Sequence, residues 1–344
     1  MNRKIIIAII VLITTGVSAV FPSDNNVSKV GTSAATFLEI PVGANAVGMG
    51  GAYVSIANDA SALYWNVAGI TNLEKKEVLA VHSDWIADTN FDFAALVLPL
   101  GKYGTFGLSI TSLTMSDMQV RTVDKPEGTG EFFDASDLSV GASYAFKLTD
   151  RFSIGFTGKY IQEKIWHMTA SAVAIDIGTL FRTDLFNGMT IGASIYNFGT
   201  SMTLDGRDTR TFGRIDDTKL GSNENIPQNI EMDSWDLPLN IQIGVSTSLI
   251  RSNEYQVTVA LDAVHPSDNY ESVNIGTEFS YANLFFLRGG YSELFLDDAE
   301  GGLSLGVGVV TGMLFSNAKI KFDYAFRDMG RLDNTQLFSL GVVF

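Results

Sequence analysis

Apolar and polar residues alternate along most of the chain after about residue 76. In the last predicted strand, Phe338, Leu340, Val342 and Phe344 share one face, and small or polar Ser339 and Gly341 lie on the other. A two-residue period is the pattern of a β-strand with two different faces. Because it recurs so often, the pattern predicts a closed barrel whose apolar face points outward into lipid.

The alternation predicts fourteen strands of roughly 9 to 11 residues, the length that a tilted strand needs to cross the hydrocarbon layer. We expect an all-β chain, with a 14-stranded antiparallel transmembrane β-barrel and an N-terminal plug that contains a short helix. The expected strands lie near residues 76–85, 90–99, 103–112, 136–147, 151–162, 170–181, 188–197, 239–249, 254–263, 271–281, 284–292, 303–313, 317–327 and 336–344.

Short and long links alternate between these strands. The short links are expected at 100–102, 148–150, 183–187, 250–253, 282–283 and 314–316, and the longer ones at 113–135, 163–169, 198–238, 265–270, 293–302 and 328–335. Outer-membrane barrels have tight periplasmic turns and long extracellular loops. The pattern therefore places both barrel termini on the periplasmic side.

Each predicted strand has one face that carries the charged and small residues. A charge on the lipid face at mid-membrane costs roughly 2–4 kcal/mol, so this face is expected to line the lumen. The predicted lumen charges, interpreted as a conduction path, a plug anchor or a paired structural network, are Lys159, Asp176, Asp262, Glu278, Arg288, Lys319, Lys321 and Asp323. Glycines on the same face leave room that another part of the chain is expected to fill.

The longest apolar run, residues 5–13, is too short for a membrane-spanning helix, which needs about 20 residues. Arg3 and Lys4 precede it and Val17-Ser18-Ala19 follows, so residues 1–19 are expected to be a Sec signal peptide. The alternative is an amphipathic first helix. We expect residues 20–75 to form the N-terminal segment and lumen plug, and residues 76–344 to form the transmembrane barrel.

Residues 34–73 lack strand alternation and are rich in Gly, Ala and Asn. Asn58 or Asp59 is expected to cap a short helix through residues 60–64. Glycines at 48, 50 and 51 permit tight turns. This small-residue composition suits a compact insert inside a barrel.

Two motifs in this segment resemble the amino-terminal signature of the PorV/PorQ family. They are Gly48-Met49-Gly50-Gly51-Ala52 and the stretch from Ala57 to Gly69. The matching positions are Gly48, Gly50, Gly51, Asp59, Ala60, Tyr64, Trp65, Asn66, Ala68 and Gly69. One position departs from the family pattern, because Val67 stands where the family commonly has proline, which would fix φ and remove an N–H.

The resemblance implies an outer-membrane barrel with an architecture similar to the FadL long-chain fatty-acid transporters. PorV-like members act in type IX secretion, where they accompany the translocon or receive exported cargo at the cell surface. FadL-like members admit hydrophobic small molecules. The expected function is therefore protein export or surface display, with a channel for hydrophobic molecules as the alternative. The expected partners are outer-membrane lipid, a secretion translocon or cargo protein and, in the alternative, a hydrophobic ligand in the lumen.

Composition narrows the chemistry further. The net charge is −15, and −17 without Arg3 and Lys4, which disfavours nucleic acid. The chain has no cysteine, and His82, His167 and His265 are far apart on the predicted strands. We expect no enzyme activity, cofactor or metal. The acidic 198–238 link is interpreted either as a loop for a partner or calcium or as a solvated loop.

Phe344 closes the lipid-facing row of the last predicted strand. It also resembles the carboxy-terminal aromatic residue by which outer-membrane barrels are recognised for insertion. We therefore expect Phe344 to be an assembly signal.

Overall fold

The computed structural model describes residues 29–215, 218, 223–296, 299–312 and 318–344. The predicted signal peptide lies outside these residues. Residues Gly31–Phe344 form one compact unit. Among the described residues, no helix has the length and apolar character needed to cross a membrane.

Fourteen long strands of the described chain form one antiparallel sheet in which chain neighbours are also sheet neighbours, and the short β11 (Asp205–Gly206) joins it by pairing with β8. The strands are β1 (Glu77–Trp85), β2 (Thr89–Pro99), β3 (Thr105–Met115), β6 (Ala135–Lys147), β7 (Phe152–Ile165), β8 (Met168–Arg182), β9 (Thr190–Gly199), β15 (Asn240–Arg251), β16 (Tyr255–Pro266), β17 (Ser272–Tyr281), β18 (Phe285–Leu294), β19 (Leu303–Gly312), β20 (Lys319–Arg327) and β21 (Thr335–Val343).

The sheet closes on itself because β1 pairs with both β2 and β21. In the seam, Glu77 is opposite Val343 and Asp84 is opposite Gln336. Closure leaves no long strand edge unpaired. The predicted 14-stranded antiparallel barrel is confirmed.

The two faces of the wall follow the predicted alternation. On β6, Ser139 and Ser143 are buried, whereas Val140 and Tyr144 are exposed. On β19, Gly306 and Gly308 are buried, whereas Val307 is 48% exposed. The exposed apolar positions form the surface that suits lipid.

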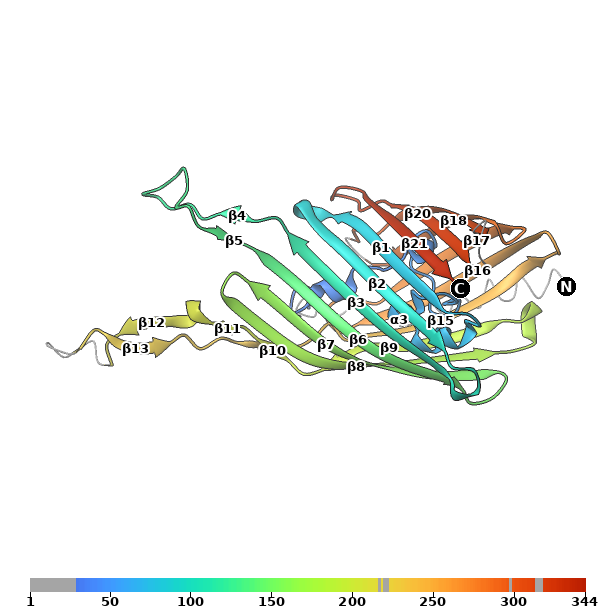
Figure 1. Ribbon diagram of the computed structural model, residues 1–344, viewed down its shortest axis with the longest axis horizontal. Helices are drawn as coiled ribbons and strands as arrows, with labels where there is room; N and C mark the ends of the chain where they lie inside the picture. Colours follow the sequence, from blue (N-terminus) through green and yellow to red (C-terminus); the bar gives the residue numbers. More distant parts are fainter. Residues whose placement is uncertain (1–28, 216–217, 219–222, 297–298, 313–317) are drawn as a thin grey trace. The chain divides into compact units, whose positions relative to one another are not determined.

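The long links contain paired segments that the sequence did not predict. The short strands are β4 (Met118–Gln119), β5 (Phe132–Phe133), β10 (Met202–Thr203), β11 (Asp205–Gly206), β12 (Arg210–Gly213), β13 (Ile226–Asn229) and β14 (Ser234–Trp235). The β4–β5 and β12–β13 pairs extend beyond the barrel strands at one end (Figure 1). The described part of the 198–238 link thus contains short paired strands but is mostly exposed, so its two interpretations, a loop for a partner or calcium and a solvated loop, stay predictions.

One predicted long link, residues 163–169, was wrong. Residues 163–169 mostly continue β7 and β8, and only Trp166 and His167 lie between the two strands. The outward side chains of this stretch, such as Gln162 and Lys164, are polar rather than apolar. The backbone nevertheless continues to pair with the neighbouring strands β6 and β8. Side-chain alternation marks the apolar belt, but hydrogen bonding decides where a strand ends.

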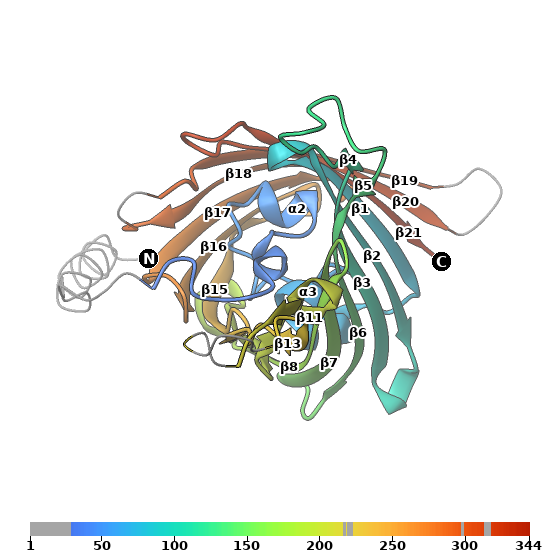
Figure 2. The same cartoon turned by 90° about the vertical axis from the view of Figure 1, so that its left-hand side faces the viewer.

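The amino-terminal segment lies within the ring of strands (Figure 2). Its helices are η1 (Thr36–Glu39), α2 (Ala44–Val47), α3 (Ala62–Trp65) and η2 (Val67–Asn72). The remaining short helices are η3 (Ile86–Asp88), η4 (Gly101–Tyr103), η5 (Leu185–Asn187) and η6 (Arg207–Thr209), which lie in links. The expected helix near residue 60 is α3, which begins later than predicted: its N-cap is Ser61, which has no side-chain cap, and Asp59 Oδ1 accepts from Ser61 N in the turn before the helix.

Candidate functional site inside the barrel

The inner segment, residues 34–73, packs directly on glycines of the barrel wall. An added Cβ at Gly48 would lie 2.9 Å from the Cα of Gly306 on β19. An added Cβ at Gly290 would meet Met49 and Gly50 at 2.2–2.5 Å. Backbone therefore lies against backbone, and any side chain would force the two apart.

The glycine turn after α2 needs unusual backbone angles. Gly50 and Gly51 have φ of +65° and +75°, a region that residues with a Cβ rarely adopt. At Gly50 an added Cβ would also approach the backbone N of Tyr291 within 2.6 Å. Sterics and conformation thus both require glycine at this position of the motif.

Asp59 joins two parts of the inner segment. Its Oδ2 accepts a hydrogen bond from Nδ2 of Asn45 at 2.5 Å, and its Oδ1 accepts from the backbone N and Oγ of Ser61. Asn45 Nδ2 also donates to the Tyr53 hydroxyl. Ala60 next to it is fully buried, and its N–H donates to Glu77 at 3.5 Å. These contacts fix α2 relative to α3.

Asn66 connects the inner segment to the wall. Its Nδ2 donates to the carbonyls of Val54 and Thr179, each at 2.9 Å, and its Oδ1 accepts from Ala68 N at 3.1 Å. The following helix η2 lies on Gly155 and Gly178, where an added Cβ would meet Ala68 N at 3.0 and 3.1 Å. Gly69 is required for a similar reason, because an added Cβ would meet the Ala57 carbonyl at 2.4 Å.

Val67 occupies the first position of η2. The N–H of a first helical residue has no partner within its helix, and proline is favoured there. The departure from the family pattern therefore falls where valine and proline are both compatible with the helix.

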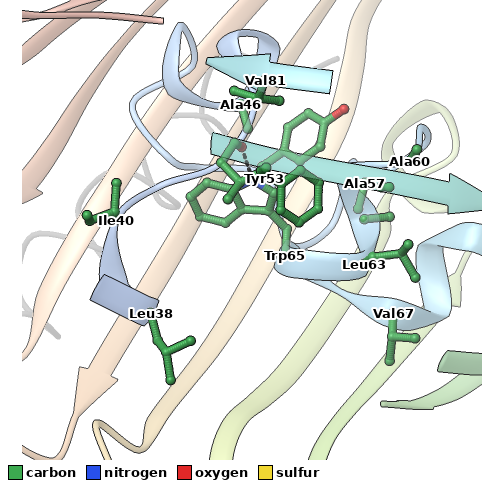
Figure 3. Packing of buried hydrophobic residues seen from close by; sticks show 14 of the residues in the cluster. Leu38, Ile40, Ala46, Tyr53, Ala57, Ala60, Leu63, Trp65, Val67 and Val81 are labelled. Atoms are coloured by element: carbon green, nitrogen blue, oxygen red, sulfur yellow. Dashed lines mark hydrogen bonds between the residues drawn. The ribbon is translucent and has the colours of Figure 1, made fainter. Parts of the chain in front are cut away.

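The aromatic residues of the motif pack in the centre of the segment. Figure 3 shows Trp65 and Tyr53 close together, and their ring centroids are 6.3 Å apart. Trp65 Nε1 donates to the Val42 carbonyl at 2.7 Å, and the Tyr196 hydroxyl of β9 donates to the Trp65 carbonyl. Tyr64 donates to the Leu38 carbonyl at 3.2 Å. Each polar tip in this apolar core has a partner.

Most of the predicted lumen charges form ion pairs across the wall. Lys159 Nζ is 2.8 Å from Asp176. Arg288 lies between Glu278 and Asp323, at 2.7 and 2.6 Å. These pairs bring together charges from separate strands and fit the interpretation as a structural network.

Three of the predicted charges lie outside those pairs. Lys321 pairs at 3.0 Å with Glu77, whose buried carboxylate also accepts from Ala60 N. Asp262 accepts from Val54 N at 2.9 Å and from Gln242, and therefore holds the inner segment directly. Lys319 is exposed at the start of β20, apart from these contacts.

Glu77 and the pair Arg327–Glu293, whose atoms are 2.9 Å apart, were not among the predicted lumen charges. The inward or outward position along the strand could have identified two of these residues as lumen charges. Glu77 shares the inward face of β1 with Leu79 and Val81, and Arg327 shares that of β20 with Lys321. Glu293 gave no such signal, because it was expected in a loop.

The three histidines lie in different places and pair with carboxylates. His82 contacts Asp92, His167 contacts Asp208 and His265 contacts Glu271. Within the described residues, no group of three or more His, Asp or Glu side chains is arranged to hold a metal ion.

Glu39 gives the inner segment a pH dependence. The residue keeps an exposed surface, but the surrounding chain removes much of its contact with bulk water; this desolvation, with smaller contributions from the carboxylates of Asp268 and Glu293, raises its pKa from 4.5 to about 7. Between these pH values the folded state holds a proton that the unfolded state releases, so the folding penalty grows as pH rises toward 7 and is complete above it. We expect Glu39→Gln to raise the urea midpoint at pH 8 but to leave it nearly unchanged at pH 4.5.

The matched control is Glu74→Gln, which changes another carboxylate with an exposed surface, just beyond the other end of the segment. It is expected to alter the midpoint little at either pH. A Glu39→Gln effect of equal size at pH 4.5 and pH 8 would show that Glu39 does not titrate in this way.

Comparisons with known proteins agree with this geometry. A family model described as "Type IX secretion system protein PorV" matches residues 23–265. A comparison with curated proteins gave no match.

Three solved structures have a similar fold. A Pseudomonas aeruginosa FadL homologue is 12% identical, with a TM-score of 0.52 over 88% of this chain and 98% of that chain. The Pseudomonas putida toluene transporter TodX is 13% identical, with a TM-score of 0.51 over 88% and 96%. The CymD monoaromatic hydrocarbon channel is 13% identical, with a TM-score of 0.50 over 88% and 97%. At this identity the likeness shows a shared fold, and the family match shows membership: the chain belongs to the PorV family of type IX secretion system proteins.

Proposed function

We propose that this outer-membrane barrel acts in protein export or surface display without being a conduit or an enzyme itself. The observation that carries the proposal is the packing of residues 34–73 inside the ring of strands. Fully buried Met49, Ala52 and Ala68 belong to this segment, and the wall contacts it through glycine backbone. A polypeptide has no path through a lumen filled in this way. Partners would therefore contact the links or the outer wall.

A pull-down from solubilised outer membranes tests this role. We expect the tagged protein to bring down a secretion translocon or exported cargo, and the purified protein to show little conductance in planar bilayers. Large steady conductance would contradict a filled lumen. The recovery of the barrel without protein partners, but with bound hydrophobic solute and with solute uptake in cells, would favour the alternative channel.

We propose that the end with the longer links faces the cell exterior and that both barrel termini face the periplasm. The β4–β5 link and residues 148–151 lie at opposite ends of the strands. We expect Asp124→Cys on intact cells to react with an impermeant maleimide and Asp150→Cys to react only after lysis. Equal labelling at both positions before lysis would contradict this orientation.

Phe344 is proposed as the assembly signal. Its side chain is 52% exposed beyond β21, and its N–H donates to the Lys76 carbonyl at 3.0 Å. We expect Phe344→Asp to reduce the heat-modifiable barrel in outer membranes severalfold, because a charge replaces the last residue of the lipid-facing row. Phe344→Tyr is the matched control and should assemble normally. Equal yields for the two variants would refute the assignment.

A further inference from the structure

A small cavity opens at the mouth of the barrel, at the end with the longer links. Its volume is about 300 Å³. One wall is the irregular chain from Gly31 to Thr36, which leads into η1, and the other walls are Glu163 of β7 and Trp235 of β14. The chain wall is fixed, since Ala34 N donates to the Asp236 carbonyl and Ala35 N donates to Glu163, each at 2.9 Å.

Glu163 lines this cavity, and a second carboxylate, Asp137, lies next to Glu163 on the neighbouring strand. Asp137 of β6 is directly opposite Glu163 in the strand register, and both lie on the inward face. Like charges directly opposite each other destabilise a strand pair. Among the described residues, neither carboxylate forms an ion pair with a basic side chain.

The nearest lysines along the strands are already engaged elsewhere. Lys164 points to the other face of β7 and contacts Asp134 at 3.2 Å. Lys159 lies two inward positions from Glu163 along β7, with Ile161 between them, and contacts Asp176 at 2.8 Å. The acidic pair thus remains without a cationic partner from its own strands.

Trp235 adds a second element of cation recognition. Trp235 lines the cavity together with Glu163 and is 49% exposed. An indole face attracts cations, and a carboxylate forms charge-assisted hydrogen bonds with guanidinium and ammonium groups. Two carboxylates alone do not provide the ligand set of a metal site, and the described residues hold no such set here.

We propose that this pocket binds a guanidinium or ammonium group, either the Arg or Lys side chain of a polypeptide or a free amine. The ligand charge would enter between Glu163 and Asp137, and its alkyl stem would lie along the Trp235 ring. The volume accommodates one side chain, so a polypeptide would be held through a single basic residue. The inference does not depend on the proposed role in secretion.

Binding to the purified full-length barrel in detergent tests the pocket directly. The probes are N-acetyl-arginine amide, its neutral analogue N-acetyl-citrulline amide, and a short neutral peptide with one central arginine, measured by calorimetry at low salt. We expect saturable binding of both arginine probes, and binding of the citrulline probe weaker by about tenfold or more, the effect of removing one charge-assisted contact. Tighter binding of the peptide than of the amide would identify a polypeptide source, and equal affinity would identify a free amine.

Three variants locate the site, with a fourth as control. Glu163→Gln keeps an oxygen that accepts from Ala35 N but removes the charge, and Asp137→Asn removes the opposing charge. Each should weaken arginine binding about tenfold, and Trp235→Leu should weaken it about threefold. Asp134→Asn removes a carboxylate of the same rim that pairs with Lys164, and should bind like the parent protein.

Heat-modifiable gel mobility shows that each variant remains folded. Equal binding of arginine and citrulline probes would overturn the proposal. So would equal affinities of Glu163→Gln and Asp134→Asn, or the absence of saturable binding to the folded parent protein.

Discussion

We expect Gly306→Trp to displace the inner segment from the barrel. An added Cβ at Gly306 would lie 3.0 Å from the Cα of Gly48, so an indole has no space without moving the segment. The strand itself is held on both sides by pairing with β18 and β20, whereas the segment is held by a smaller set of contacts. Overpacking typically costs about 1–3 kcal/mol, and more where backbone is the neighbour. The inner segment, rather than β19, should therefore move.

The measurement is limited proteolysis of the folded barrel together with planar-bilayer conductance. Gly306→Trp should make residues 34–73 cleavable and raise conductance. Val307→Trp is the matched control, because Val307 faces outward and is 48% exposed. If both variants resist protease and remain closed, the close contact between Gly48 and Gly306 does not control the position of the segment.

Gly244→Trp is expected to have the same outcome by another route. An added Cβ at Gly244 would collide with the carboxylate of Asp262 rather than with the segment itself. Asp262 accepts a hydrogen bond from Val54 N, so moving it would release the middle of the segment. A closed, protease-resistant Gly244→Trp barrel would show that the Asp262 contact is dispensable.

The number of strands, and which side chains of each strand point to the lumen, were predictable from the sequence for one physical reason. A shift of one residue exchanges the two faces of a strand, and lipid on one side tolerates few charges. The positions of Gly141 and Ser143 inside and Val140 outside follow from this parity alone. The same parity identified Lys159 and Asp176 as inward charges.

Pairing between charges was not predictable from one sequence. Arg288 lies between Glu278 of β17 and Asp323 of β20, and the latter contact crosses an intervening strand. Such contacts depend on strand register and barrel tilt, which the alternation of a single strand does not contain. The acid pair Asp137 and Glu163 was missed because Glu163 was assigned to a link, although hydrogen bonding extends β7 to Ile165.

Part of the amino-terminal motif was predictable from the sequence, and part depended on tertiary contacts. Its small residues indicated a compact insert, and the requirement for glycine at Gly50 follows from its positive φ. Which wall residues it meets depends on tertiary contacts such as the Gly48–Gly306 approach. Asp59 accepts from Ser61 N as an N-cap does, but the helix begins only at Ala62, and the contact of Asp59 with Asn45 could not be predicted from local sequence.

The second large effect is expected at Arg288, whose side chain is 6% exposed. Its guanidinium contacts Glu278 and Asp323 and also lies 5.0 Å from the centre of the Phe286 ring. Arg288→Met keeps much of the side-chain volume but leaves two largely buried carboxylates without their cation. Breaking a buried ion pair by removing one partner typically costs about 3–5 kcal/mol. We expect a large decrease in the urea midpoint of the barrel, measured by loss of the heat-modifiable band.

Arg151→Met is the matched control, because its contact with Asp184 joins side chains that are 60% and 82% exposed. Exposed pairs contribute about 0–1 kcal/mol, so this midpoint should change little. The triple variant with Arg288→Met, Glu278→Gln and Asp323→Asn should recover part of the loss, since it removes the uncompensated charges as well as the cation. If Arg288→Met and Arg151→Met lower the midpoint equally, the lumen network does not stabilise the barrel. If the triple variant is less stable than Arg288→Met, the cost comes from lost hydrogen bonds rather than from stranded charge.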